Sequence, residues 1–200
     1  MDTELKYITV AELFGDPPSK AKMESLASNL EALSSVSRRI RNISRIKNAQ
    51  KRAESLAGIY LLSKMADLSQ GELTCTPDGK PHLNRGPEFN ISHSFGLAVC
   101  VTDSEPIGID VEMLRHIGDA ERLAKRYFSL EEQRRIDLAD DREREILRIW
   151  TKKEAYLKMT GEGLAGNIAE LNTESLSVSF RELTVTVDGA EYFITVCKQN

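Results

Sequence analysis

Apolar residues recur at three- and four-residue spacing over two parts of the chain, and this spacing predicts amphipathic helices. The first helical part runs from Ser19 to about Met65, with a break expected near Asn42–Ser44, because Asn and Ser compete with the helical backbone for hydrogen bonds. Three later helices are expected at 119–128, from 129 onward and at 143–160. Ser129 and Glu132 form the capping box that opens the middle one.

Alternating or short apolar segments, bounded by turn residues, predict strands. These are expected at 6–14, 89–92, 97–102, 107–113, 176–180, 183–187 and 192–197. The turn at Ser104–Pro106 predicts an antiparallel pair between its two flanking strands, and Asp188–Gly189 predicts a turn near the end of the chain. Short extended pieces are expected around Pro77–Gly79. Helices and antiparallel strands that occur in blocks favour the α+β class.

The composition argues against several classes of protein. The 200 residues carry a formal net charge of −4, which gives no general attraction to nucleic acid or to anionic membranes. No apolar run in the sequence resembles a signal core or a membrane span. Cys75, Cys100 and Cys197 are far apart and lack metal-binding spacing, so we expect buried, reduced thiols in a cytoplasmic protein.

One segment is strongly basic despite the acidic total. Seven Lys or Arg residues and no acid occur from Arg38 to Arg52. The segment is expected either to bind a polyanion or to form a solvated face. Nucleic acid is the less favoured polyanion, because no aromatic residue is interleaved with the basic ones to stack on bases.

Asp110 and Glu112 stand in the otherwise apolar segment GIDVE at 108–112. Side chains alternate between the two faces of a strand, so both acids project from one face while Ile109 and Val111 face the core. Neighbouring carboxylates repel and raise each other's pKa, and a divalent cation such as Mg²⁺, which prefers carboxylate oxygens, removes that repulsion. The alternative is a half-exposed strand with a solvated acidic face.

The segment WTKKEAYLK at 150–158 carries a second charged cluster on an expected helix. Glu154 and Lys158 are four residues apart and share one face, with Lys153 on the flank and Trp150 one turn before Glu154. One interpretation makes Glu154 a third carboxylate for a metal and Lys158 a partner for a phosphate. The other is an ordinary Glu–Lys helix pair, which is common on solvated faces.

Two segments earlier in the chain are candidates for anion binding. His93 lies between Ser92 and Ser94 just before a turn, where hydroxyl, imidazole and backbone donors suit a phosphate. Adjacent strand residues point to opposite faces, which argues against a serine–histidine hydrolase. Lys80 lies at a turn in DGKPHL, which suits either a phosphate or an ordinary solvated loop.

In this order, the motifs resemble those of the 4′-phosphopantetheinyl transferases, specifically the larger Sfp-type group. The matching segments are RAESLAG (52–58), GKP (79–81), FNISHS (89–94), GIDVE (108–112), AKRYFS with Glu132 following, and WTKKEAYLK with GEGL (150–164). The pairing of GIDVE with W-x-x-K-E-A-x-x-K at this separation is the most specific part of the resemblance, which covers about residues 51–164.

The resemblance implies an enzyme that transfers the phosphopantetheine arm of coenzyme A to a serine of an apo acyl or peptidyl carrier protein, with Mg²⁺ as cofactor. It implies that Asp110, Glu112 and Glu154 bind the metal and that Glu154 and Lys158 are catalytic. The residues implied to contact coenzyme A are Arg52, Lys80, Ser92, His93, Lys153 and Lys158. Whether Glu154 or a metal-bound water takes the serine proton stays open.

The resemblance also implies an architecture and a partner surface. Sfp-type chains are monomeric pseudo-dimers of two similar subdomains, each an antiparallel sheet packed on a long helix, so we expect halves at 1–104 and 105–200. The second half would carry the carboxylates. An acidic carrier is expected to dock on residues 115–128 through Arg115, Arg122, Lys125 and Arg126. Two alternatives are a coenzyme A-binding module without catalysis and a Mg²⁺-dependent phosphate-ester hydrolase that needs no carrier.

Overall fold

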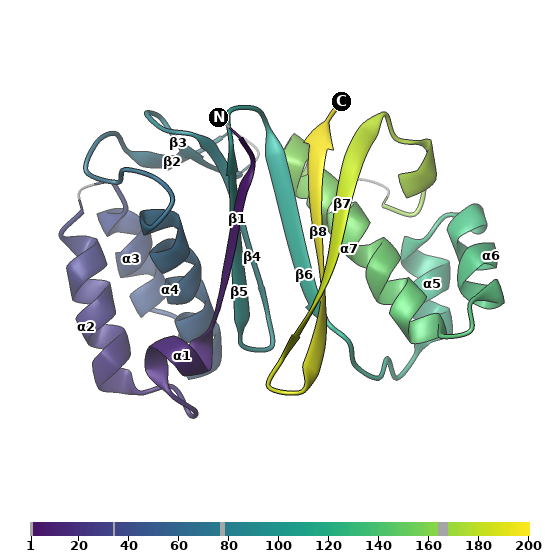
Figure 1. Cartoon of the computed structure of the whole chain (residues 1–200), viewed down its shortest axis with the longest axis horizontal. Helices are drawn as coiled ribbons and strands as arrows, with labels where there is room; N and C mark the ends of the chain where they lie inside the picture. Colours follow the sequence, from purple (N-terminus) through teal and green to yellow (C-terminus); the bar gives the residue numbers. More distant parts are fainter. Residues whose placement is uncertain (1, 34, 77–78, 164–167) are drawn as a thin grey trace.

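The computed structural model describes residues 2–33, 35–76, 79–163 and 168–200, and its elements form four layers (Figure 1). Up to residue 103 the elements are β1 (Glu4–Thr9), α1 (Val10–Phe14), α2 (Lys20–Glu31), α3 (Ser37–Ser44), α4 (Ala49–Ser63), β2 (Leu73–Cys75), β3 (Pro81–Leu83), β4 (Glu88–Ser94) and β5 (Leu97–Asp103). The later elements are β6 (Ile107–Met113), α5 (Ala120–Tyr127), α6 (Leu130–Leu138), α7 (Arg142–Thr160), a 3-10 turn at Thr173–Ser175, β7 (Val178–Val187) and β8 (Ala190–Gln199).

Two antiparallel three-stranded sheets form the centre of the molecule. The first has the strand order β1-β5-β4 and the second β6-β8-β7, while β2 and β3 form a separate short pair. In Figure 1, α1 to α4 cover the outer face of the first sheet and α5 to α7 lie outside the second. The α+β class is therefore confirmed. The division at residue 104 and the similarity of the two halves stay predictions.

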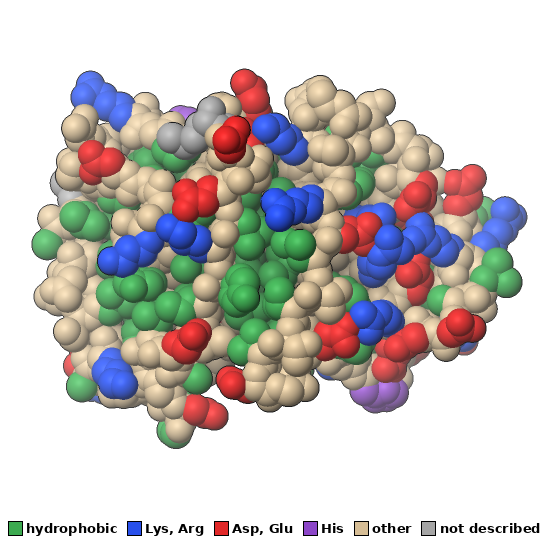
Figure 2. Space-filling view, viewed as in Figure 1, with side chains coloured by type: hydrophobic (Ala, Val, Ile, Leu, Met, Phe, Trp, Pro, Cys, Tyr) green, Lys and Arg blue, Asp and Glu red, His purple; other side chains and the backbone are tan. Residues whose placement is uncertain are grey.

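The apolar core follows from strand alternation. All seven residues of β5 are buried. Its Ala98 and Cys100 pack among α1 to α4, whereas Val99 and Val101 pack against Ile109 and other residues of the second sheet. Figure 2 shows hydrophobic side chains gathered near the centre of the molecule, between the two sheets, on the face where β1 and β7 lie. A strand with two buried faces reads as a continuous apolar run, which is what LAVCV provides.

The predicted hairpin across Ser104–Pro106 is wrong. β5 pairs with β1 and β4, and β6 pairs with β8, so residues 104–106 cross from one sheet to the other. The hairpin lies one turn earlier, at Phe95–Gly96, where both residues have positive φ angles of 43° and 90°. A two-residue hairpin turn requires such angles, but Phe rarely adopts them, and the sequence signal for this turn is therefore weak.

The last three predicted strands are in fact two. β7 runs without a break through Arg181 and Glu182, and the turn at Asp188–Gly189 joins it to β8 as predicted. Its apolar residues occupy even-numbered positions at the start of the strand and odd-numbered positions from Leu183 onward. Val178 and Phe180 pack near α7, while the odd-numbered residues from Leu183 onward face the first sheet. A strand that packs on different faces at its two ends looks like two strands in the sequence.

The early helices also differ from the prediction. The strand expected at 6–14 ends at Thr9, whose hydroxyl accepts the Glu12 N–H at 3.0 Å while Glu12 accepts the Thr9 N–H at 2.8 Å. This capping box opens α1. The long helical part has two breaks, one between α2 and α3 and one between α3 and α4, rather than one near 42–44.

The remaining expectations concern thiols, turns and membranes. The cysteines are free; Cys100 and Cys197 are buried, but Cys75 is exposed, which corrects the prediction for it. Pro77 and Asp78 of the turn at 77–79, and Leu164 of GEGL, lie outside the described residues. Within the described chain, each helix is too short or too polar to cross a bilayer.

Candidate functional site

Two polar rows meet where β4 of the first sheet lies beside β6 of the second. Alternation places Ser92 and Ser94 on the same side of β4. The Ser92 hydroxyl donates to Asp110 Oδ1 at 2.8 Å, and the Ser94 hydroxyl donates to Glu112 Oε2 at 2.9 Å. The two acids of GIDVE thus share one face, as predicted, but that face meets another sheet instead of solvent.

Gly108, the first residue of GIDVE, sets how closely α7 approaches β6. A Cβ at this position would overlap the carbonyl oxygen of Ala155 and lie 2.6 Å from the Met159 nitrogen. The helix therefore rests directly on the strand backbone. This contact brings the face of α7 that carries Glu154 and Lys158 over Asp110.

Asp110 is nearly buried, at 5% exposure, and is held by a lysine from α7. Lys158 Nζ lies 2.7 Å from Asp110 Oδ1 and donates to the Ser92 hydroxyl oxygen at 2.9 Å. Asp110 Oδ2 is buried and has no hydrogen-bond partner within the described part of the chain. A buried carboxylate oxygen without a partner is costly, and such an atom marks a position where a ligand can bind.

Glu112 lies at the more open end of the same row. Arg115 Nη1 lies 2.9 Å from Glu112 Oε2, and the guanidinium of Arg115 lies 5.0 Å from the ring centroid of the exposed Phe95. Arg115, expected to bind a carrier, is therefore engaged within the chain. Lys125 pairs with Glu121 on α5 at 2.6 Å.

Glu154 has the most unusual environment of the three acids. Burial raises its pKa, and the neighbouring charges of Asp110 and Glu112 raise it further, while Lys158 acts in the opposite direction. The pKa reaches about 7. A carboxyl group that is half protonated near neutral pH can accept a proton or bind a cation that relieves the repulsion.

Two pockets of about 310 Å³ each open beside Glu154 and Lys158. One contains Asp110, Glu112, Ser92, His93 and the sole tryptophan, Trp150. The other contains Lys80, whose Nζ donates to the Met159 carbonyl oxygen at 2.8 Å. Burial lowers the pKa of Lys80, and Glu88 opposes that effect.

The cavity system continues towards the basic helix α3. A pocket of about 120 Å³ is lined by His93, Ser55 and Arg39, and one of about 380 Å³ by Arg38 and Arg39. Arg52 lies one helical turn before Ser55 and so faces the same side of α4. Arg38 and Arg39 of the basic run therefore line pockets that share lining residues, one with the next, back to the pocket of Asp110 and Glu154, and these adjoining pockets are termed the groove.

Lys153 is a predicted site residue that the structure does not bring to this group, and Arg52 also lines none of the four pockets described above. The side chain of Lys153 is fully buried, its Nζ lies 2.7 Å from Glu132 Oε2, and it donates to the carbonyl oxygens of Ile168, at 2.9 Å, and Leu171. Glu132 also accepts the N–H of Thr173 at 3.1 Å. This geometry gives Lys153 a structural role in tying α6 and the chain near 168–173 to α7. The contact of Lys153 with coenzyme A stays a prediction.

The described residues contain no group of three His, Cys, Asp or Glu side chains arranged to hold a metal ion. In this structure Asp110 forms an ion pair with Lys158, and Glu112 forms one with Arg115. The chemistry of the donor set nevertheless fits a hard cation, because three carboxylates share one pocket and Asp110 Oδ2 lacks a partner among the described atoms. Carboxylates that raise the pKa of Glu154 also favour a bound cation.

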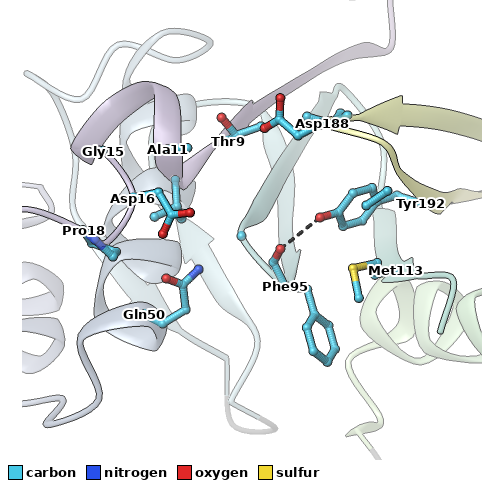
Figure 3. A pocket seen from close by; sticks show the side chains of 14 residues that line it. Thr9, Ala11, Gly15, Asp16, Pro18, Gln50, Phe95, Met113, Asp188 and Tyr192 are labelled. Carbon is cyan, nitrogen blue, oxygen red and sulfur yellow. Dashed lines mark hydrogen bonds between the residues drawn. The ribbon is translucent and has the colours of Figure 1, made fainter. Parts of the chain in front are cut away.

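A further pocket, of about 300 Å³, lies at the Phe95–Gly96 turn (Figure 3). Gln50 of α4 and Pro18 line it together with Met113 of β6 and Tyr192 of β8. The Tyr192 hydroxyl donates to the Phe95 carbonyl oxygen at 2.9 Å, drawn as a dashed line in Figure 3.

The sequence analysis did not predict the contacts of three residues in this region. Asn90 accepts the Ile109 N–H with its Oδ1 at 3.2 Å, Ser94 binds Glu112, and Glu54 lies 3.2 Å from His93 Nδ1. The polar residues of FNISHS repeat every two positions, as do the acids of GIDVE. This shared period was the signal available for Asn90 and Ser94. Glu54 lies within the segment RAESLAG, but nothing in that segment indicates a contact with His93.

Comparison with known proteins gives consistent results. The sequence profile of the 4′-phosphopantetheinyl transferase superfamily matches residues 106–199, which include Asp110, Glu112, Glu154 and Lys158. The 4′-phosphopantetheinyl transferase AcpT of Salmonella typhi is 36% identical over 138 residues, covering 64% of this chain and 70% of AcpT.

Other relatives match over shorter segments. HetI of Nostoc sp., a 4′-phosphopantetheinyl transferase, is 46% identical over 95 residues, or 44% of this chain and 40% of HetI. The 4′-phosphopantetheinyl transferase Sfp of Bacillus subtilis is 39% identical over 92 residues, again 44% and 40%. The match thus spans less than half the length of HetI and of Sfp. A crystal structure of holo-[acyl-carrier-protein] synthase from Thermotoga maritima aligns with a TM-score of 0.32 at 19% identity, covering 48% of this chain and 64% of that one.

Proposed function

Because the chain belongs to the 4′-phosphopantetheinyl transferase superfamily, we propose that it transfers the 4′-phosphopantetheine arm of coenzyme A to a serine of an apo acyl or peptidyl carrier protein. The second product is 3′,5′-ADP. The reaction breaks the bond between the pantetheine phosphorus and the bridging oxygen of the pyrophosphate. The serine oxygen takes the place of that oxygen.

The observation that carries this proposal is the shared pocket of Asp110, Glu112 and Glu154 with Lys158 beside them. Transfer of a phosphoryl-type group needs charge compensation and alignment more than covalent help from the protein. Asp110, Glu112 and Glu154 would hold Mg²⁺, which supplies compensation for the negative charge of the pyrophosphate. The unpartnered Asp110 Oδ2 supports this assignment.

The basic and hydroxyl groups of the groove would orient coenzyme A. Lys158 and Ser92 already donate hydrogen bonds at the pocket and would turn to phosphate oxygens. Lys80 lines the adjoining pocket, and Arg39 lies further along the groove, where the phosphorylated adenosine end would fit. Arg52 is placed on the same side of α4 by helical spacing.

The attacking serine must lose a proton. Glu154 lines the same pocket and is the acid proposed to accept it; its pKa of about 7 is that of the metal-free site, where burial and two neighbouring acids raise it, and bound Mg²⁺ would lower it. The carrier would approach along α5, where Arg122 and Arg126 are exposed. The two halves, divided near residue 104, would each contribute one wall of the groove.

The direct test mixes the protein with Mg²⁺, coenzyme A and an apo carrier, and then weighs the carrier by mass spectrometry. We expect a mass increase of one phosphopantetheine group. Asp110→Asn and Glu154→Gln should each abolish the increase while retaining the wild-type circular dichroism spectrum. Full transfer by either variant would contradict the site assignment.

The same mixture separates the alternatives. A coenzyme A-binding module would bind coenzyme A but leave the carrier unmodified. A Mg²⁺-dependent hydrolase would release 3′,5′-ADP without any carrier present. We expect coenzyme A to stay intact until the apo carrier is added, and a carrier whose acceptor serine is replaced by alanine serves as the control.

A further inference from the structure

Glu54 lies on α4 behind His93 and takes no part in the chemistry proposed above. It is only 6% exposed, yet it keeps its charge. Burial alone would raise its pKa, but hydrogen bonds from His93, the Gly96 N–H and Gln50 outweigh burial and hold the pKa below its ordinary value. A buried charge is costly unless it is fully bonded, so a carboxylate with three donors acts as a fixed anion.

Glu54 holds the hairpin that carries the serines of the site. The Gly96 N–H donates to Glu54 Oε1 at 2.8 Å, and the Gly96 carbonyl oxygen accepts the Val10 N–H at 2.7 Å. From the other half, the Tyr192 hydroxyl donates to the carbonyl oxygen of Phe95 (Figure 3). The turn between β4 and β5 is therefore fixed from both sides, and His93 lies three residues before Gly96.

The same carboxylate fixes the ring of His93. Nδ1 of His93 lies 3.2 Å from Glu54 Oε2. A carboxylate only accepts, so Nδ1 carries a hydrogen, and Nε2 is the nitrogen left for a ligand. His93 is among the residues that line the pocket of Asp110, Glu154 and Lys158, and it also lines the smaller pocket beside Arg39 and Ser55.

We propose that Glu54 is the positioning residue of His93, setting the rotation and tautomer of the imidazole so that Nε2 meets a phosphate group of coenzyme A. The ligand named here rests on the proposed function. To donate from Nε2 to a phosphate oxygen, the ring must take up a proton from solvent as the phosphate binds, so that both nitrogens carry a hydrogen. The adjacent carboxylate then compensates the charge of the ring. Glu54 thus acts through His93 and touches neither substrate.

A double-mutant cycle on coenzyme A binding tests this role. Binding of coenzyme A in the presence of Mg²⁺ is measured by calorimetry for wild type, Glu54→Gln, His93→Ala and the double variant. Glu54→Gln should weaken binding about tenfold, the size of one charge-assisted hydrogen bond. In the His93→Ala background it should weaken binding less than about twofold, because the group through which it acts is gone. Equal weakening in both backgrounds would overturn the proposal.

The ¹⁵N chemical shifts of the imidazole nitrogens report the tautomer of His93 directly, and they do not change merely because a variant is less stable. In ¹⁵N-labelled protein without ligand, His93 should be protonated at Nδ1, and Glu54→Gln should shift the hydrogen to Nε2, because its amide donates where the carboxylate accepted. Gln50→Ala is the matched control. It removes only the longest of the three contacts to that carboxylate, at 3.3 Å, and keeps the donors His93 and Gly96, so the tautomer should stay unchanged and the affinity should fall less than in Glu54→Gln.

The outcomes separate this proposal from the proposed function. A coupled cycle together with an unmodified carrier would support Glu54 and contradict transfer. An additive cycle together with normal transfer would overturn the role of Glu54 and leave the enzyme assignment intact. Wild-type His93 without a hydrogen on Nδ1 would also overturn it, whatever the activity.

Discussion

Glu154 shows how strongly one residue depends on its neighbours. Its spacing from Lys158 suggested an ordinary helix pair, but Lys158 is paired with Asp110 instead. Glu154 is left in a half-buried position beside two other acids, which is why its pKa is raised. Helical periodicity predicts which residues share a face; it does not predict which strand lies opposite that face.

The raised pKa of Glu154 predicts a pH-dependent cost to stability. The pKa is about 7 in the folded chain against an ordinary 4.5, so wild type loses stability as pH rises from about 4.5 through about 7. Glu154→Gln removes this loss and should stabilise the metal-free protein at pH 8 by about 2 kcal/mol, with no gain below pH 4. Urea unfolding in EDTA at several pH values measures the difference.

Magnesium provides the control for that series. If Glu154 helps to bind Mg²⁺, adding the ion at pH 8 should raise the melting temperature of wild type. The difference in melting temperature between wild type and Glu154→Gln should then become smaller. A Glu154→Gln protein that is no more stable than wild type at pH 8 would show that the ionised Glu154 carboxylate is not destabilised by burial and by the neighbouring acids.

The residue scale also marks the limit of prediction from sequence. Alternation in GIDVE placed Asp110 and Glu112 on one face with Ile109 and Val111 in the core, and this is confirmed. That Ser92 binds Asp110 was beyond reach, because the two residues lie in different sheets and only tertiary packing brings them together.

At the scale of elements, the contact between β6 and α7 predicts the effect of a single methyl group. In Gly108→Ala the added Cβ would overlap the backbone of α7 at Ala155. The helix must move, at a cost of about 1–3 kcal/mol. Displacement of Glu154 by even about 1 Å should reduce transfer by roughly a hundredfold.

Gly118→Ala is the matched control for that substitution, because a Cβ at 118 meets no atom of the described chain within 4 Å. Unfolding by urea and the rate of carrier modification are measured for both variants. An unchanged rate in Gly108→Ala would mean that α7 can shift without disturbing the site.

The neighbouring lysines of α7 predict opposite outcomes. Lys153→Met leaves the buried Glu132 without its cationic partner and should cost about 3–5 kcal/mol. Lys152→Met, the control, should cost about 1 kcal/mol or less. Its two acidic partners remain paired with arginines, Glu174 with Arg135 and Glu182 with Arg148. Urea denaturation measures both free energies of unfolding. Lost affinity for coenzyme A in Lys153→Met at wild-type stability would instead support the role implied by family resemblance.

Elements were predictable where one face of a segment packs against one surface. The helices at 119–128 and 143–160 and the capping box of Ser129 and Glu132 are confirmed to within a residue or two. The errors fall where packing changes along a segment, as in β7, or where a short polar turn joins two sheets, as at 104–106.

At the scale of the whole molecule, kinetics should separate the proposed carrier surface on α5 from the proposed coenzyme A site. Reversing the charges of Arg122 and Arg126 to Glu should raise KM for an acidic carrier about tenfold at low salt, with little change in KM for coenzyme A. Lys22→Glu on α2, also exposed, is the control. Steady-state kinetics with each substrate varied decides the matter, and a carrier KM unchanged by the double reversal would place docking elsewhere.

The position of Trp150 has a practical consequence. It is the sole tryptophan of the chain, it packs edge-on to Tyr127 with ring centroids 5.5 Å apart, and it lines the pocket of the three acids. Its indole emission should therefore respond when that pocket fills. The protein carries its own optical reporter, so occupancy could be titrated on unlabelled material and followed in a stopped-flow fluorimeter within a single turnover.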